Sequence, residues 1–184
     1  MAATTSAAGK TTLSKDEIAR LLAALDQNRI RFFSEPLRLR WRLHGGEPGS
    51  GSDAVALVAD ESGRLQAVYT RSRFDRSYQP PMLVEHFTGP LNFEQAAELV
   101  RTLLETPLFR ETLPEESARG MADLMKETWE FQRGFTAAVS VSKTVFEPFP
   151  QNLSKPRAAF RALMAHLERS GERVVKSTKA PGKD

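Results

Sequence analysis

Apolar and basic residues alternate without a break between residues 37 and 44, and this alternation constrains the fold more than any other feature. The apolar positions are Leu37, Leu39, Trp41 and Leu43, and the basic positions are Arg38, Arg40, Arg42 and His44. A period of two is that of a β-strand, whose successive side chains point to opposite faces of its sheet. We therefore expect a strand that buries one face and exposes three guanidinium groups on the other, where they form a candidate binding surface.

The length of the chain suits one hydrophobic core. Its 184 residues are 40% hydrophobic, which is enough for one domain of ordinary size and too little for two. We expect a disordered N-terminal tail over 1–13, a single α+β domain over 14–173 and a disordered basic C-terminal tail over 174–184. No segment approaches the roughly 18 consecutive apolar residues of a membrane span, so we expect no membrane association.

Cap signals ahead of apolar stripes indicate the helices. Ser14 and Glu17 form a capping box before a stripe with helical spacing, and this first helix should end near Gln27. Asn92 and Gln95 give the same signature before a second helix. The pattern predicts two more helices, one over 114–126 and a last one from Ser154 to the stop at Gly171.

Several strands accompany the first one. The nearly continuous apolar run 54–59 is typical of a central strand, and residues 65–73 follow it with Leu65, Ala67 and Tyr69 on one face. A fourth strand is expected over 82–87, and 129–131 with 136–146 should form a hairpin. The fold class that follows is α+β: a single domain with a mainly antiparallel sheet of five to six strands, three to four helices packed on one face, and the order α-βββ(β)-α-(α)-ββ-α.

A second basic segment follows the third expected strand. Arg71, Arg73, Arg76 and Tyr78 lie in or beside RSRFDRSYQPP, whose two prolines forbid regular pairing and favour an exposed loop. Together with the three arginines of the first strand, these four residues make up the predicted binding site. Phe74 is an alternative to Tyr78 as a stacking surface.

No residues have the spacing of a catalytic or metal site. The phosphate-binding loop pattern needs a glycine five residues before Gly9, where the chain has Thr4. A cluster of His44, His86 and Glu85 across neighbouring strands is the arrangement that would favour an enzyme; isolated imidazoles bonded to their neighbours are the simpler interpretation. We therefore predict a protein that is not an enzyme, with no cofactor and no metal.

The compartment is indicated by cysteine usage. The absence of cysteine excludes disulfides and thiolate chemistry, and it agrees with a reducing environment. The first fifteen residues lack the apolar run of a secretory signal, so we expect a cytoplasmic protein. Their Ala-, Ser- and Thr-rich composition leaves an organelle-targeting leader as the alternative.

Charge is unevenly distributed along the chain. Residues 29–76 carry nine bases against six acids, 77–130 carry four against ten, and 131–184 carry ten against four. Such a division favours a protein partner of complementary charge over a nucleic acid, whose dedicated binders are more often basic throughout. We call Arg38, Arg40 and Arg42 the arginine stripe, and it has three interpretations. It is a solvated face whose cations pair with acids across strands, a surface that binds an acidic protein, or a surface that binds the phosphate backbone of a nucleic acid.

The order of elements is similar to that of the type III secretion chaperones, and the hairpin and helix units resemble those of small protease-inhibitor domains of the emfourin kind. The first resemblance implies binding of extended segments of another protein, although those chaperones are usually acidic and this chain has a basic stripe. We therefore predict a non-enzymatic protein-binding domain, an adaptor, chaperone-like factor or inhibitor, whose partner is a protein with an acidic surface. The alternative is a nucleic-acid-binding protein that uses the arginine stripe.

Overall fold

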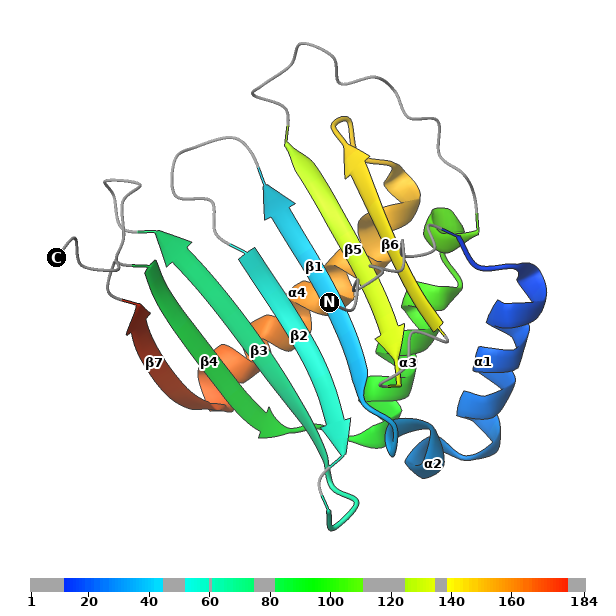
Figure 1. Cartoon of the computed structure of the whole chain (residues 1–184), viewed down its shortest axis with the longest axis horizontal. Coiled ribbons are helices and arrows are strands. Elements are labelled where there is room, and N and C mark those ends of the chain that lie inside the picture. Colours follow the sequence, from blue (N-terminus) through cyan, green and yellow to red (C-terminus); the bar gives the residue numbers. More distant parts are fainter. Residues whose placement is uncertain are drawn as a thin grey trace, which may run out of the picture.

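The computed structural model describes residues 12–44, 52–59, 61–74, 82–110, 125–134 and 139–178. Its elements are α1 (Lys15–Gln27), α2 (Arg29–Phe33), β1 (Leu37–His44), β2 (Ser52–Ala59), β3 (Leu65–Phe74), β4 (Met82–Pro90), α3 (Phe93–Leu104), η1 (Pro107–Phe109), β5 (Lys126–Arg133), β6 (Val139–Phe146), η2 (Gln151–Leu153), α4 (Ser154–Ser170) and β7 (Glu172–Thr178). Figure 1 shows their arrangement. The predicted α+β single domain is confirmed.

The strands form one antiparallel sheet in the order β6-β5-β1-β2-β3-β4-β7. β1 to β4 follow one another as a meander, and β5 returns to pair with β1 on its other side. β2 therefore lies in the middle of the seven strands, as its apolar sequence predicts. The sheet has one strand more than the five to six expected, and that strand is β7.

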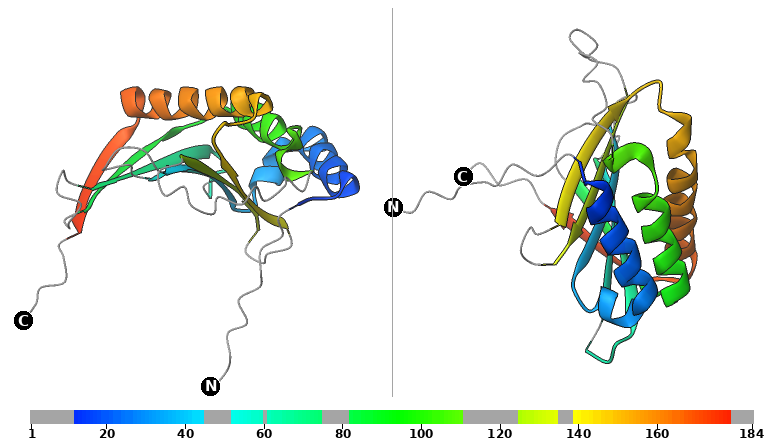
Figure 2. Two further views of the ribbon diagram at one scale, coloured as in Figure 1. Left: turned by 90° about the horizontal axis from the view of Figure 1, so that it is seen from above. Right: turned by 90° about the vertical axis from the view of Figure 1, so that its right-hand side faces the viewer.

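All the helices lie on one side of the sheet (Figure 2). α4 crosses β3 and β4, and α3 packs between α4 and α1. The two edges of the sheet bend away from the helix layer, so the uncovered face is concave (Figure 2). We call this concave side the open face and the other the helix-covered face. Within the ranges that the structure describes, no helix is both long and apolar enough to cross a bilayer.

The predicted cap signals at the first two long helices are confirmed. The Ser14 hydroxyl accepts from the Glu17 N–H, while the Glu17 carboxylate accepts from the Ser14 N–H at 2.8 Å. Asn92 and Gln95 form the same reciprocal pair at α3. α1 ends at Gln27, and α4 runs from Ser154 to Ser170 before Gly171, as expected.

The core lies between the sheet and the helix layer. Trp41 and Trp129 stack across β1 and β5 with ring centroids 5.7 Å apart, and Phe160 of α4 meets Trp129 edge-on at 5.5 Å. Each of these side chains is buried, as is Leu25 of α1. Burial of this apolar layer holds the helices onto one face of the sheet. The open face takes no part in the core, so its properties depend on the polar and charged residues that point to it.

Three expected boundaries need correction. The sequence predicts a disordered C-terminal tail from residue 174, but 172–178 form β7, which pairs with β4 along its length. Leu13, placed in the N-terminal tail, is 2% exposed, and its N–H donates to the Phe109 carbonyl. The helix predicted over 114–126 falls mainly outside the described residues, and its last residue, Lys126, begins β5 instead.

Candidate functional site

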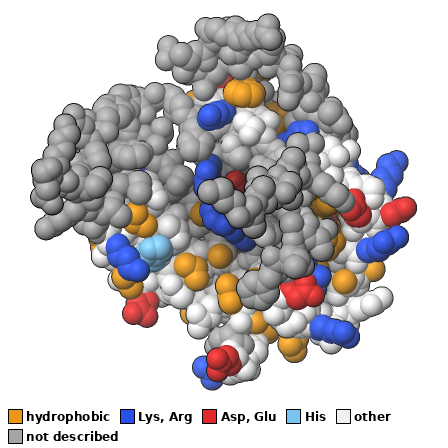
Figure 3. Space-filling view, viewed as in Figure 1, with side chains coloured by type: hydrophobic (Ala, Val, Ile, Leu, Met, Phe, Trp, Pro, Cys, Tyr) orange, Lys and Arg blue, Asp and Glu red, His pale blue; other side chains and the backbone are white. Residues whose placement is uncertain are grey.

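The alternation in β1 places its arginines on the open face. Leu37 and Leu39 are fully buried on the helix-covered face, so the intervening Arg38 and the two arginines that follow at alternate positions point the other way. Arg38 is exposed there, whereas Arg40 and Arg42 are half-buried. Figure 3 shows basic side chains gathered toward the middle of this face.

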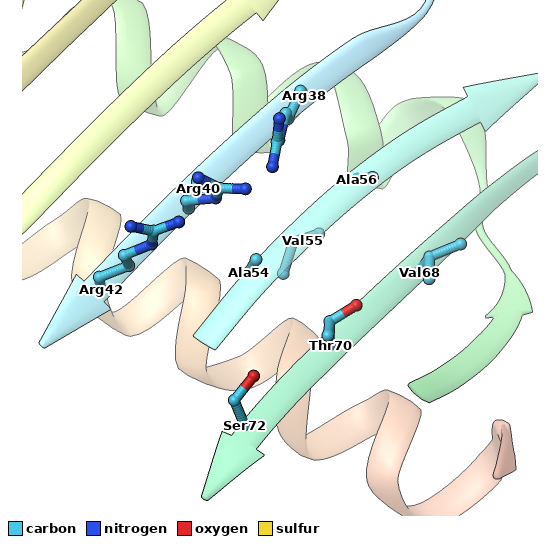
Figure 4. Close-up of a pocket in the computed structure, with 9 residues that line it drawn as sticks. All are labelled: Arg38, Arg40, Arg42, Ala54, Val55, Ala56, Val68, Thr70 and Ser72. Atoms are coloured by element: carbon cyan, nitrogen blue, oxygen red, sulfur yellow. The ribbon is translucent and has the colours of Figure 1, made fainter. Parts of the chain in front are cut away.

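The arginines border a hollow of about 320 Å³ on the open face. Its walls and floor come from three adjacent strands: Arg38, Arg40 and Arg42 of β1, Ala54, Val55 and Ala56 of β2, and Val68, Thr70 and Ser72 of β3 (Figure 4). The floor is low because Ala54 and Ala56, which face this side, have side chains of a single carbon. The result is a depression with a cationic wall on one side and a wall of small polar and apolar groups on the other. Its volume is at the lower end of the range typical of ligand sites.

The stripe is only partly neutralised by the protein itself. Arg40 forms an ion pair of 3.1 Å with Glu130, which lies directly opposite it on β5. Among the residues that the structure describes, neither Arg38 nor Arg42 has an acidic partner. Cross-strand pairing therefore neutralises one arginine of the three, Arg40.

Two donors of the stripe are buried and lack an acceptor. The Nε atoms of Arg40 and Arg42 are shielded from solvent, yet neither donates to any atom of the described residues. An unsatisfied buried donor costs roughly 1–3 kcal/mol. Arg38 and Arg42 also border the hollow without an acidic partner among the described residues, so their charge favours an anionic occupant over a neutral one.

Arg71 and Arg73 do not belong to this surface, which corrects the prediction. Both lie on the helix-covered face of β3, at the same alternate positions as buried Ala67 and Tyr69. The sheet therefore separates them from the stripe of β1. The two remaining predicted site residues, Arg76 and Tyr78, lie outside the described residues, and so does the side chain of Phe74.

Arg71 instead belongs to an ion-pair network beneath α4. Its guanidinium donates to Glu85 of β4 and to Glu168 of α4, each at 2.8 Å, and Arg173 of β7 donates to the same Glu85. Beside it, Arg73 pairs with Asp53 of β2 at 3.3 Å. The network ties β3, β4 and β7 to the end of α4, and the separate Arg73 pair joins β3 to β2, so these arginines serve the structure of the domain.

The titration of Glu85 reflects this network. Glu85 is 5% exposed, and burial alone would raise the pKa of its carboxyl group. The hydrogen bonds from Arg173 and Arg71 outweigh burial and hold the pKa below its ordinary value of 4.5. In the same region burial, together with the hydrogen bond that Tyr69 donates to Asp53 at 2.6 Å, raises the pKa of Tyr69.

Glu85→Gln is expected to flatten the pH dependence of stability at acid pH. Because the pKa of Glu85 is lower in the folded chain than in the unfolded one, its stabilising contribution is complete above about pH 4.5 and is lost as the pH falls through the folded value. Urea unfolding of both proteins from neutral pH down to about pH 3 measures this difference. Glu61→Gln, in an exposed turn, is the matched control. Parallel loss of stability in wild type and Glu85→Gln would contradict the assignment.

The histidine cluster does not form. His86 lies on the open face, where its Nδ1 is 3.1 Å from the Thr70 hydroxyl at the wall of the hollow. Glu85, as the preceding residue of the same strand, points to the opposite face, and the side chain of His44 is not among those described. No group of three metal-ligating side chains occurs within the described parts of the chain.

The sequence prediction missed the residues that shape the hollow. Ala54 and Ala56 alternate with Val55 and Leu57, and this small-large alternation was a readable signal for a depression on one face of a central strand. Glu130 had no such signal. Its position opposite Arg40 depends on the register between β1 and β5, a strand that begins only at Lys126.

Comparison with models of known protein families, with curated proteins and with solved structures found no match to this chain. A function for this chain can therefore be inferred only from the geometry of the fold and of the hollow.

Proposed function

We propose that this chain is a non-enzymatic protein-binding domain that takes an extended acidic segment of another protein onto its open face. The observation that carries the proposal is the positive charge beside the hollow, where Arg38 and Arg42 have no acidic partner among the described residues. An adaptor, a chaperone-like factor and an inhibitor would each use such a surface. A cytoplasmic setting is part of the proposal.

The spacing of the stripe suits an extended peptide. Arg38, Arg40 and Arg42 occupy alternate positions of one strand, so their Cα atoms are about 6.6–6.8 Å apart. An extended segment lying along β1 repeats its own side chains on one side at the same interval. Asp or Glu at every second position would therefore meet successive guanidinium groups, which favour carboxylates through charge-assisted, bidentate hydrogen bonds.

A labelled peptide of alternating Glu and Thr is the probe for this function. We expect it to bind more tightly than a peptide of the same composition with its Glu residues in one block, because only the alternating peptide matches the interval of the arginines. Changing Arg38, Arg40 and Arg42 together to Glu should weaken binding by at least about a hundredfold, since three pairs of roughly 1 kcal/mol are lost and like charges then face each other. Fluorescence anisotropy measures both affinities.

The matched control changes three exposed arginines of the helix layer, Arg20, Arg31 and Arg169, to Glu. This variant carries the same change in net charge and should retain the affinity of the wild type. Equal weakening in both triple variants would show that net charge alone governs binding and would overturn the assignment of the site.

A single-stranded oligonucleotide tests the alternative function. The same interval of about 6.6–6.8 Å is close to that of successive phosphates, so a nucleic-acid backbone could follow the stripe. Tighter binding of the oligonucleotide than of the peptide, with a steep loss as salt rises, would establish the alternative in its place.

A further inference from the structure

The free edge of β7 is the most exposed apolar segment of the described sheet. β7 is the last strand in the sheet order and pairs on one side only, with β4. Its two central residues, Val174 and Val175, are 44% and 46% exposed. A free strand edge presents unpaired backbone N–H and C=O groups, which another strand can satisfy.

The opposite edge of the sheet is protected in a way that β7 is not. On β6 the side chain of Lys143 points to the helix-covered face and is 8% exposed, so a charge lies inward at that edge. An inward charge is a known means of preventing the addition of a further strand. Within 172–176 of β7, no side chain is buried.

The charges of β7 are complementary to those of a second copy of the same strand. In an antiparallel pair centred on Val174, Glu172 of one copy lies opposite Lys176 of the other, and the reverse pair forms at the other end. Because directly opposite residues share a face, Glu172, Val174 and Lys176 all meet their counterparts on the open face. The two valines would then contact each other between two ion pairs.

We propose that two copies of this chain associate through their β7 strands, antiparallel and centred on Val174, to form one continuous sheet. The arrangement is a two-fold symmetric interface, in which one surface serves both partners. Charged residues on an edge ordinarily discourage pairing, but here the two-fold axis places each acid against a base. The inference is independent of the function proposed for the hollow.

Charge reversal at the two ends of β7 tests the pairing. Glu172→Lys alone sets lysine against lysine in the homodimer, and Lys176→Glu alone sets glutamate against glutamate, so each single variant should dimerise about tenfold more weakly than wild type. The double variant Glu172→Lys/Lys176→Glu restores both attractions and should recover the affinity of the wild type. Sedimentation equilibrium over a concentration series up to high micromolar measures the association.

A mixture of the two single variants gives a sharper readout. One strand then carries two lysines and the other carries two glutamates, so the mixed dimer has both ion pairs while neither homodimer has any. We expect the equimolar mixture to form dimers at concentrations where each variant alone is monomeric. Glu61→Lys is the control for a change of charge remote from β7, and circular dichroism verifies that every variant is folded.

Each result of these dimerisation experiments either supports or overturns the proposed β7 pairing. Recovery of dimerisation in the mixture and in the double variant supports the register centred on Val174. A wild type that stays monomeric throughout the concentration series would overturn the proposal, as would single variants that dimerise like wild type or a mixture that fails to recover. Assemblies larger than a dimer that persist in the single variants would place self-association on another surface and would also overturn it.

Discussion

Replacing Arg157 with Met is expected to lower the free energy of unfolding by about 3–5 kcal/mol. Glu127 of β5 is 1% exposed, and its two carboxylate oxygens accept from the Arg157 Nε at 2.7 and 2.9 Å. The guanidinium also lies 4.5 Å from the ring centroid of Phe149. Methionine fills part of the volume but supplies no charge, so the variant leaves a carboxylate buried without its cation. Urea unfolding measures the loss.

The double variant Glu127→Gln/Arg157→Met is the control that identifies the cause. The glutamine introduced in place of Glu127 is neutral, so no buried charge remains. Its side-chain oxygen can still accept from the Trp129 Nε1, as Glu127 does at 3.2 Å. We expect this variant to recover most of the stability lost in the single variant, because the desolvation of both charges is removed together. A double variant as unstable as Arg157→Met would show that lost packing, and not the unpaired charge, is responsible.

Trp129→Ala is expected to cost about 3–5 kcal/mol, which is a large part of the total stability of a typical domain. Trp129 is fully buried, stacks on Trp41 and meets Phe160 of α4 edge-on. Its removal opens a cavity where the sheet and the helix layer join, and the neighbouring strands can close only part of it. The midpoint of thermal unfolding should fall accordingly.

Phe146→Ala is the matched control for the loss of an aromatic ring. Phe146 lies at the end of the edge strand β6 and is 37% exposed, so its removal leaves no enclosed cavity. We expect a clearly smaller loss than for Trp129→Ala. Similar losses in the two variants would mean that Trp129 does not anchor the junction between the layers.

The predictable parts of this fold are those determined by local sequence. The reciprocal bonds of Ser14 with Glu17 are contained within four residues, and the strict alternation around Arg40 assigns each side chain of β1 to a face. Neither depends on distant contacts. The starts of α1, α3 and α4, the central position of β2 and the placement of the arginine stripe opposite the helices could therefore be read from the sequence, whereas the short helix α2 was not predicted.

The face on which Arg71 and Arg73 lie is also contained in the local sequence, although the prediction places them on the wrong one. Ala67 and Tyr69 were already assigned to the buried face of the same strand, and Arg71 and Arg73 continue that alternation. The expected strand, residues 65–73, already contains both arginines, so the same alternation carried to its end places them beneath the helices. Their closeness to the Pro-rich end of RSRFDRSYQPP favours an exposed loop instead and conceals this alternation.

Other features carry no local signal. β7 could not be recognised because residues 172–176 are all exposed, so no apolar period marks it as a strand. The position of Glu127 beside inward-facing Trp129 indicates a buried acid that needs a cation, but its partner Arg157 lies on α4, thirty residues away. Only the packing of α4 over β5 brings the two together.

The position of β1 in the sheet affects how the chain emerges from the ribosome. β1 has its first partner, β2, next to it along the chain, but its other edge pairs with β5, whose first residue, Lys126, is made long after Leu37. Until β5 is synthesised, a strand containing Trp41 keeps one edge unpaired, and such edges attract other nascent chains. We therefore expect the nascent chain to be most prone to aggregation until Arg133, the last residue of β5, has left the exit tunnel.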